Sequence, residues 1–150
     1  MRRLFYINYF DVTLNLFTSF GYFDTEKDHV NALKTFRKCL TAEGILVLDY
    51  FNTEKIIRNL NHCETKSLDG ITFNITKNVI DGKIIKKINF EDKQKVYNFE
   101  ERVQAFSFED FQRMITKAGM VIETTFGSYG LDDFEENNSD RLILICKKAW

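Results

Sequence analysis

Hydrophobic periodicity in the first third of the chain predicts a strand, a helix and a second strand. Residues 12–17 form a short apolar run that is typical of a buried strand. Apolar side chains then recur at helical spacing after Thr25, a favourable N-cap residue, as far as Leu40. After a turn at residues 42–44, residues 45–51 begin with four consecutive apolar side chains, which indicates burial on both faces and a parallel sheet. The pattern therefore predicts one βαβ unit with a right-handed crossover.

The middle third alternates apolar and polar side chains, as strands with one buried face do. Asp81-Gly82 separates two such runs, and Asp-Gly in this position is a strong hairpin signal. A second turn is expected at residues 92–94. The expected strands are residues 71–76, 83–90 and 95–106. We expect an antiparallel β-meander with one apolar face, inserted as residues 63–106 into a single domain of residues 1–150.

The last third returns to a helix followed by strands. Ser107 is a favourable helix N-cap, and Gly119 is a favourable stop after the apolar helical stripe that follows. Residues 121–126 and 142–146 have the composition of strands, and an acidic stretch at residues 132–140 separates them. These two strands can pair antiparallel at the edge of a sheet.

Composition narrows the functional classes. The net charge of −1 creates no field that attracts nucleic acid or anionic lipid, and no apolar run is long enough for a transmembrane helix, so neither partner is expected. Cys39, Cys63 and Cys146 show no metal-ligand spacing with one another or with histidine. No metal site is therefore expected, and the thiols fit a reduced, cytoplasmic protein.

Several segments, in this order and spacing, resemble the second half of class I S-adenosylmethionine (SAM)-dependent methyltransferases that act on small molecules. They are Phe10-Asp11-Val12, Phe20-Gly21-Tyr22, residues 40–49, residues 106–110, residues 117–120 and residues 139–145. One departure is Ala42-Glu43-Gly44, which keeps only the last glycine of the usual Pro-Gly-Gly. The family's glycine-rich SAM-binding loop precedes these segments and is absent here, so the resemblance implies an N-terminally truncated domain.

The resemblance implies an α/β fold, a partial Rossmann-like doubly wound sheet with the inserted meander. Residues 12–17 and 45–51 would be the fourth and fifth strands of a seven-stranded methyltransferase sheet. Without the earlier strands, residues 12–17 would form an exposed apolar edge. The chain is then expected to be unstable alone, a homodimer through that edge, or dependent on the missing segment.

The resemblance also implies where ligands bind, because sites in open α/β sheets lie outside the carboxyl ends of the strands. Contacts to SAM are expected from Asn15, Leu16, Phe17, Ser19 and Gly21. Contacts to a small-molecule acceptor are expected from Tyr22, Asp49, Tyr50, Asn52, Arg102 and Tyr129. No catalytic residue is identified, because methyl transfer from a sulfonium mainly requires positioning of the reactants.

Structural roles remain open for the same residues. Leu16 and Phe17 could be core side chains, Tyr22 could pack on the following helix, and Arg102 could form a solvated charge pair. Arg141 is expected to pair with Asp132, Asp133 or Glu135 rather than to contact the acceptor.

The expected function is SAM-dependent methyl transfer to a small molecule, with activity of the isolated chain left open. One alternative is a non-catalytic half-domain that binds a partner subunit. Another is a different α/β enzyme, such as a dinucleotide oxidoreductase. That class needs a GxGxxG motif after a strand, and the sequence has none, although a truncated methyltransferase lacks it equally.

Overall fold

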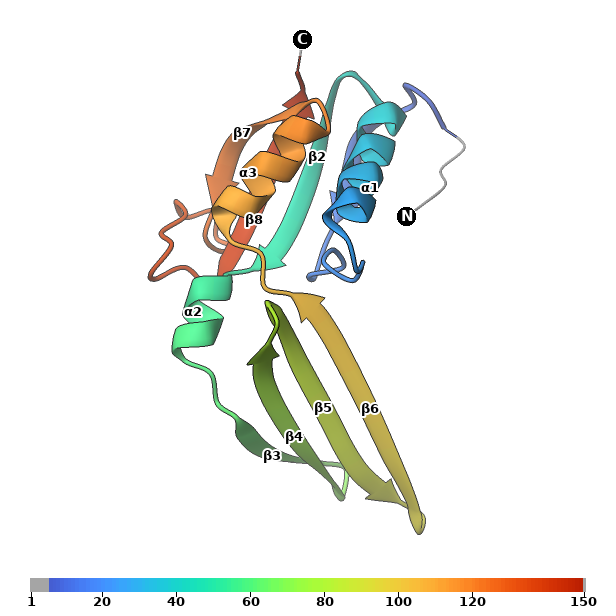
Figure 1. The fold of residues 1–150 in the computed structure, drawn as a ribbon, viewed down its shortest axis with the longest axis vertical. Helices are drawn as coiled ribbons and strands as arrows, with labels where there is room; N and C mark the ends of the chain where they lie inside the picture. Colours follow the sequence, from blue (N-terminus) through green and yellow to red (C-terminus); the bar gives the residue numbers. More distant parts are fainter. Residues whose placement is uncertain (1–5, 150) are drawn as a thin grey trace. The chain divides into compact units, whose positions relative to one another are not determined.

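The computed structural model describes residues 6–149, and the chain divides into two compact units. The first unit combines the chain up to Lys55 with the chain from Phe106 onward, and the second unit spans Ile56–Ala105. Each unit is built around its own sheet (Figure 1). The segment expected as an insertion, residues 63–106, lies almost entirely within the second unit.

The sheet of the first unit is mixed, with the described strands in the order β1-β2-β8-β7. β1 (Phe10–Asn15) pairs parallel with β2 (Leu40–Phe51), as the predicted βαβ unit requires. β8 (Arg141–Lys148) pairs antiparallel with β2, and β7 (Met120–Phe126) pairs antiparallel with β8. The expected antiparallel pair near the C-terminus is confirmed, with β7 at one edge of the sheet and β1 at the other.

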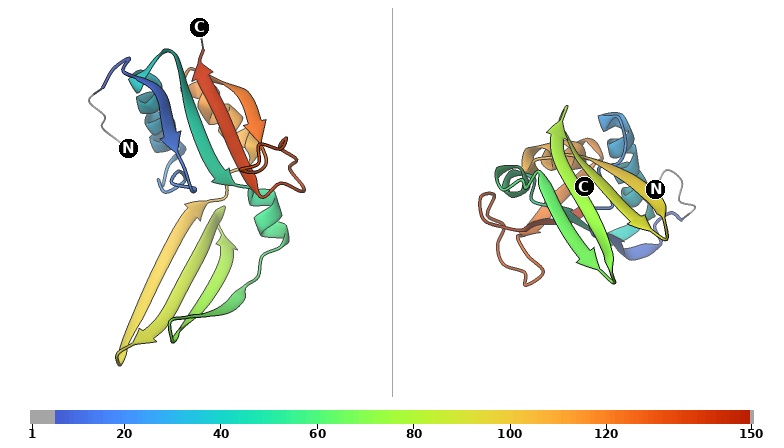
Figure 2. Two further views of the ribbon diagram at one scale, coloured as in Figure 1. Left: turned by 180° about the vertical axis from the view of Figure 1, so that it is seen from behind. Right: turned by 90° about the horizontal axis from the view of Figure 1, so that it is seen from below.

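Two helices, α1 (Glu26–Cys39) and α3 (Phe108–Lys117), cover one face of this sheet, as Figure 1 and the left view of Figure 2 show. α1 begins after Thr25, whose side chain accepts a hydrogen bond from the Asp28 backbone N–H. α3 begins with a complete capping box between Ser107 and Asp110. Both N-terminal caps therefore lie where the sequence predicts them.

The core of the first unit lies between the helices and the sheet. Leu46, Leu48 and Tyr50 alternate along β2 and are fully buried against the helices. On the opposite face of the same sheet, Val12 and Leu14 of β1 are 50% and 59% exposed. The apolar run at residues 45–48 predicts burial on both faces of the sheet. Among residues 6–149, helices cover only one of these faces.

β2 begins earlier than the sequence predicts. Residues 42–44 belong to the strand, because Phe10 of β1 pairs with Leu40, and the ladder resumes at Val12 and Ile45 after a register shift. A Cβ atom on Gly44 would lie 2.8 Å from the Phe10 carbonyl oxygen. Glycine at this position therefore allows the two strands to approach closely.

The second unit is an antiparallel sheet in the order β3-β4-β5-β6. Its strands are β3 (Cys63–Leu68), β4 (Ile71–Ile80), β5 (Lys83–Asp92) and β6 (Lys95–Gln104). The meander is confirmed, and both predicted turns carry residues with positive φ. The additional strand, β3, was not expected because its sequence contains little apolar alternation. The short helix α2 (Thr53–Arg58) precedes the strands of this unit in the sequence. Among residues 6–149, no helix is long and apolar enough to cross a membrane.

Candidate functional site

The loop after β1 has an unusual backbone. Phe17 and Thr18 adopt φ angles of 56° and 59°, so two consecutive residues with side chains occupy the left-handed region. Each such residue costs about 1–3 kcal/mol and persists only where the surroundings hold it. The loop lies at the carboxyl end of β1, where ligand sites of open α/β sheets are found.

Asp49, near the end of the neighbouring strand β2, holds this backbone in place. Its Oδ2 atom accepts a hydrogen bond of 2.7 Å from the Phe17 backbone N–H. Its backbone carbonyl accepts a hydrogen bond of 3.1 Å from the Thr18 N–H. One residue of β2 therefore binds both left-handed residues of the loop.

The Asp49 carboxylate is itself fully buried, with 0% exposure, and is paired with a cation. Arg141 donates to Oδ1 through Nε at 2.8 Å and Nη2 at 2.6 Å. Arg141 also donates to the Thr18 hydroxyl at 3.2 Å, and the Tyr129 hydroxyl donates to Asp49 Oδ2 at 3.0 Å. We call Phe17, Thr18, Asp49, Tyr129 and Arg141 the Asp49 cluster.

Tyr129 extends the Asp49 cluster toward solvent. The guanidinium carbon of Arg141 lies 5.7 Å from the centroid of the Tyr129 ring, within the range of a cation–π contact. Desolvation of the hydroxyl, and next its hydrogen bond to Asp49, raise the pKa of Tyr129 above its ordinary value. The hydroxyl therefore stays protonated and can donate to the carboxylate.

The prediction that Arg141 pairs with Asp132, Asp133 or Glu135 is wrong, because its ion pair is with Asp49. The register of β2 and β8 explains the difference. Asp49 lies opposite Ile143, and Arg141 lies two residues before Ile143, at the start of β8 and on the same face of the sheet. A long side chain at this diagonal position reaches the carboxylate.

The residues predicted to contact SAM all lie at the end of β1 and in the loop that follows. Asn15 is 5% exposed, whereas Phe17 is 77% exposed. The Ser19 hydroxyl donates to the Leu16 carbonyl within the loop, and Gly21 has a φ of 98° that favours glycine. The structure brings these residues together, and their contact with a cofactor stays a prediction.

The residues predicted to contact an acceptor are more scattered. Asp49 and Tyr129 meet in the Asp49 cluster, and Tyr22 follows the loop with its side chain 49% exposed. Arg102 belongs to β6 of the other unit, where it pairs with Glu100. Their roles in binding an acceptor likewise stay predictions.

Tyr50 and Asn52 have clear structural surroundings. Tyr50 is fully buried, and its ring centroid lies 5.0 Å from that of Phe111. Asn52 Nδ2 donates to the carbonyls of Glu136 at 2.7 Å and Ser139 at 2.8 Å, which fixes the segment before β8. The packing of Tyr50 and the hydrogen bonds of Asn52 therefore stabilise the carboxyl end of β2 and do not depend on a bound ligand.

The sequence offers little signal that Thr18 or His29 contributes to this site. Thr18 is identified only by its left-handed backbone and its bond to Arg141. His29 is 1% exposed beside the Phe20 and Phe23 rings, where burial lowers its pKa. Among residues 6–149, no group of three or more His, Cys, Asp or Glu side chains could hold a metal ion.

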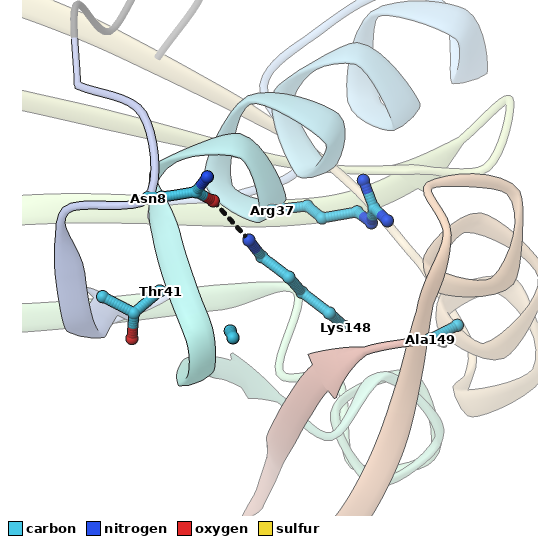
Figure 3. Close-up of a pocket in the computed structure, with 6 residues that line it drawn as sticks. Asn8, Arg37, Thr41, Lys148 and Ala149 are labelled. Atoms are coloured by element: carbon cyan, nitrogen blue, oxygen red, sulfur yellow. Dashed lines mark hydrogen bonds between the residues drawn. The ribbon is translucent and has the colours of Figure 1, made fainter.

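A separate hollow of about 400 Å³ lies at the other end of the same sheet (Figure 3). Its lining residues are Asn8, Arg37, Thr41, Ala42, Lys148 and Ala149. Lys148 donates to Asn8 Oδ1 at 2.8 Å, and Arg37 Nε donates to the Gly119 carbonyl at 2.8 Å. None of the residues predicted to bind cofactor or acceptor lines this hollow.

Several solved structures with a similar fold are methyltransferases. An S-adenosylmethionine-dependent methyltransferase from Clostridium acetobutylicum matches 99% of this chain at 16% identity, with a TM-score of 0.84. The CcbJ methyltransferase from Streptomyces caelestis matches 94% at 12% identity, with a TM-score of 0.81. The sugar N-methyltransferase KedS8 from a Streptoalloteichus species matches 95% at 15% identity, with a TM-score of 0.70.

These matches define the class of fold. The chain has the Rossmann-like α/β fold of class I methyltransferases, which confirms the resemblance and the fold class expected from the sequence. It spans 61% of the first two of these solved chains and 57% of the third. No protein-family model matches the sequence, and no curated protein matches it.

Proposed function

We propose that this chain takes part in methyl transfer from SAM to a small-molecule acceptor, at the carboxyl ends of β1 and β2. The observation that carries the proposal is the strained loop after β1, fixed by the buried Asp49 cluster. Backbone strain that is held by surrounding contacts is common where a protein binds a ligand. The methyltransferase fold supports the same location, because strand ends of such sheets carry ligand sites.

The loop after β1 exposes aromatic side chains that suit the binding of SAM. Phe17 projects an exposed aromatic ring, and Tyr22 is half exposed further along the same loop. Aromatic faces attract cations, and SAM would supply a methyl group on a positively charged sulfur. We assign Leu16, Phe17 and the backbone to Gly21 to the cofactor side, and Tyr22 to the acceptor side.

Asp49 and Arg141 are assigned a positioning role. Both carboxylate oxygens of Asp49 already accept hydrogen bonds, from Arg141, Phe17 and Tyr129. Asp49 and Arg141 would therefore hold the loop after β1 in one conformation before a ligand binds. Such preorganisation suits an in-line methyl transfer, which depends on the alignment of acceptor and methyl group.

Amines on small glycosylated molecules are the acceptor class to test first. Among the similar structures are a sugar N-methyltransferase, an amino pentose methyltransferase and a glycopeptide N-methyltransferase. An amine must be unprotonated to attack the methyl group, so a general base is needed only if the bound amine carries a proton. Transfer would be measured with radiolabelled SAM and a panel of amino sugars.

The first experiment is a calorimetric titration of the chain with S-adenosylhomocysteine. Binding in the micromolar range is expected, and Phe17→Ala should weaken it about tenfold, which corresponds to about 1.4 kcal/mol. Val121→Ala is the matched control, because Val121 is also an exposed apolar side chain and lies on the far edge strand. Absence of binding by the folded chain would contradict the assignment of the cofactor site to this chain alone.

A second candidate function is a non-catalytic half-domain that binds a partner subunit. The observation in its favour is that β1, at the edge of the sheet formed by residues 6–149, pairs only with β2, in a chain that spans 61% of its first structural match. Binding of S-adenosylhomocysteine only after a second polypeptide is added would favour this candidate. Binding by the chain alone would favour the first.

A further inference from the structure

His29 is a buried titratable side chain that lies outside the Asp49 cluster. It belongs to the first turns of α1 and is 1% exposed. The rings of Phe20, Phe23 and Phe106 pack edge-on against its imidazole, with centroid distances of 5.0, 5.1 and 4.9 Å. A polar ring in such apolar surroundings requires hydrogen-bond partners.

Both ring nitrogens of His29 have a backbone partner. Nδ1 lies 2.9 Å from the Thr25 carbonyl oxygen, which can only accept, so Nδ1 carries a proton and donates it. Nε2 lies 3.3 Å from the Phe23 backbone nitrogen, whose N–H can only donate, so Nε2 carries no proton and accepts. The two partners therefore assign the neutral imidazole, with its proton on Nδ1.

These two hydrogen bonds join the end of the loop after β1 to the start of α1. Phe23 directly follows Tyr22 in this loop, and Thr25 is the N-cap of α1. Asp49 binds the backbone at the other end of the same loop. The loop is therefore held by hydrogen bonds at both ends, and the bonds at its second end require a neutral histidine.

We propose that His29 is a positioning residue that fixes residues 20–24 while its imidazole is neutral and releases them when it is protonated. A second proton would place an N–H group at Nε2, so that two donors would face each other at Phe23. It would also place a charge on a buried ring. The role of this release in methyl transfer rests on the function proposed above, which assigns Gly21 to the cofactor side and Tyr22 to the acceptor side.

The surroundings of His29 act on its proton in opposite directions. Desolvation by burial is the largest effect, and it holds the pKa of His29 below its ordinary value. The groups that favour the protonated ring are the Thr25 carbonyl and the carboxylates of Asp28, Asp24 and Glu26. Burial outweighs these groups, so the fixed loop contains a neutral ring at neutral pH.

Two further elements pack around this region, α3 and β2. Hydrogen bonds from Lys117 and Arg113 of α3 lower the pKa of Glu26, so this carboxylate stays charged at mildly acidic pH. The Tyr50 ring of β2 lies 6.3 Å from the Phe106 ring, and burial raises the pKa of Tyr50, so its hydroxyl stays neutral.

The direction of the pH effect follows from the lowered pKa. Residues 20–24 are fully fixed above the ordinary pKa of histidine, and they are released as the pH falls through the lower pKa of the buried ring. Between these two values, the equilibrium constant for release rises by up to about tenfold per pH unit.

The test measures amide hydrogen exchange at Phe23 in the full chain without ligand, corrected for the intrinsic effect of pH on exchange. Protection of this amide should fall about threefold or more between about pH 7.5 and about pH 5.5. His29→Gln should remove this fall, because a Gln side chain does not titrate. His62→Gln is the matched control, since His62 is the second of the chain's two histidines and is exposed on the other unit, and this variant should keep the fall.

A second measurement needs no variant. The amide resonance of Phe23 should titrate in NMR spectra with the same midpoint as the His29 ring. Protection of Phe23 that is equal at both pH values, a fall that persists in His29→Gln, or two different midpoints would overturn the proposal.

Calorimetry with S-adenosylhomocysteine measures the effect on the proposed ligand site. Its affinity should weaken about threefold or more over the same pH range in the original chain and in His62→Gln, but not in His29→Gln. An affinity that stays constant while Phe23 is released would overturn the positioning role. If the folded chain binds no S-adenosylhomocysteine at either pH, the proposed function fails for the chain alone, and exchange at Phe23 still decides whether His29 fixes the loop.

Discussion

The substitution Asp49→Asn tests the central claim about the Asp49 cluster. It preserves the size of the side chain and removes its charge. The carboxylate is fully buried and accepts hydrogen bonds from Arg141, the Phe17 backbone and Tyr129. An amide has one acceptor oxygen, and its NH₂ group would point toward one of these donors. The substitution therefore breaks the ion pair and places two donors against each other.

The expected loss of stability follows from the burial of the two partners. Removing one partner of a buried ion pair costs about 3–5 kcal/mol. The Arg141 side chain is 20% exposed and can regain part of its hydration, which places the expected loss near about 3 kcal/mol. Tyr129→Phe removes a single hydrogen bond near the surface and should cost only about 1 kcal/mol.

Urea unfolding followed by circular dichroism measures these losses, and amide exchange reports on the loop itself. Exchange at Phe17 and Thr18 should accelerate in Asp49→Asn, because both amides donate to Asp49. Asp132→Asn is the control, since this exposed carboxylate should change stability by less than about 0.5 kcal/mol. A loss below about 1 kcal/mol in Asp49→Asn, with unchanged exchange at both amides, would refute the positioning role.

Three further predictions concern the framework of the first unit. Gly44→Ala should lower the free energy of unfolding by about 1–3 kcal/mol in urea titrations, because the new methyl carbon would lie 2.8 Å from the Phe10 carbonyl oxygen. Burial lowers the pKa of His29, so protonation of His29 favours the unfolded chain, and the free energy of unfolding should fall as the pH decreases below about 6.5. The substitution His29→Gln should remove the part of this pH dependence that comes from His29. Identical pH dependence of stability in the variant and the original chain would contradict the prediction. Ser107→Ala should cost about 1 kcal/mol through loss of the α3 capping box, whereas Ser67→Ala on an exposed strand should not change the unfolding midpoint.

Local signals in the sequence were sufficient for most elements of the fold. The caps at Thr25 and Ser107 are chemical signals confined to four residues, and both helices begin where these signals lie. The Asp81-Gly82 turn is equally local and forms the expected hairpin. The unbroken apolar run at residues 45–48 predicts the parallel pairing of β1 with β2, which the structure confirms, but it does not predict that β2 also pairs antiparallel with β8.

Features that depend on pairing between distant strands could not be predicted in the same way. The ion pair between Asp49 and Arg141 joins residues 92 positions apart and requires the register of β2 against β8. The extension of β2 back to Leu40 depends on how Phe10 meets it across the sheet. Likewise, the resemblance predicts a site at the end of β1, but it does not predict the left-handed backbone of Phe17 and Thr18, which contacts with Asp49 hold in place.

The energetics of the Asp49 cluster favour a role in geometry over a role in stability. Burying an ion pair is close to neutral when both partners are present, so the cluster adds little net stability to the first unit. Two left-handed residues add a cost of about 1–3 kcal/mol each, which a relaxed loop would avoid. What the cluster provides is one fixed path for the backbone at the carboxyl end of β1, with Phe17 held outward. A loop fixed in this way does not need to be ordered by its ligand, and the conformational entropy that binding would otherwise cost is already lost on folding.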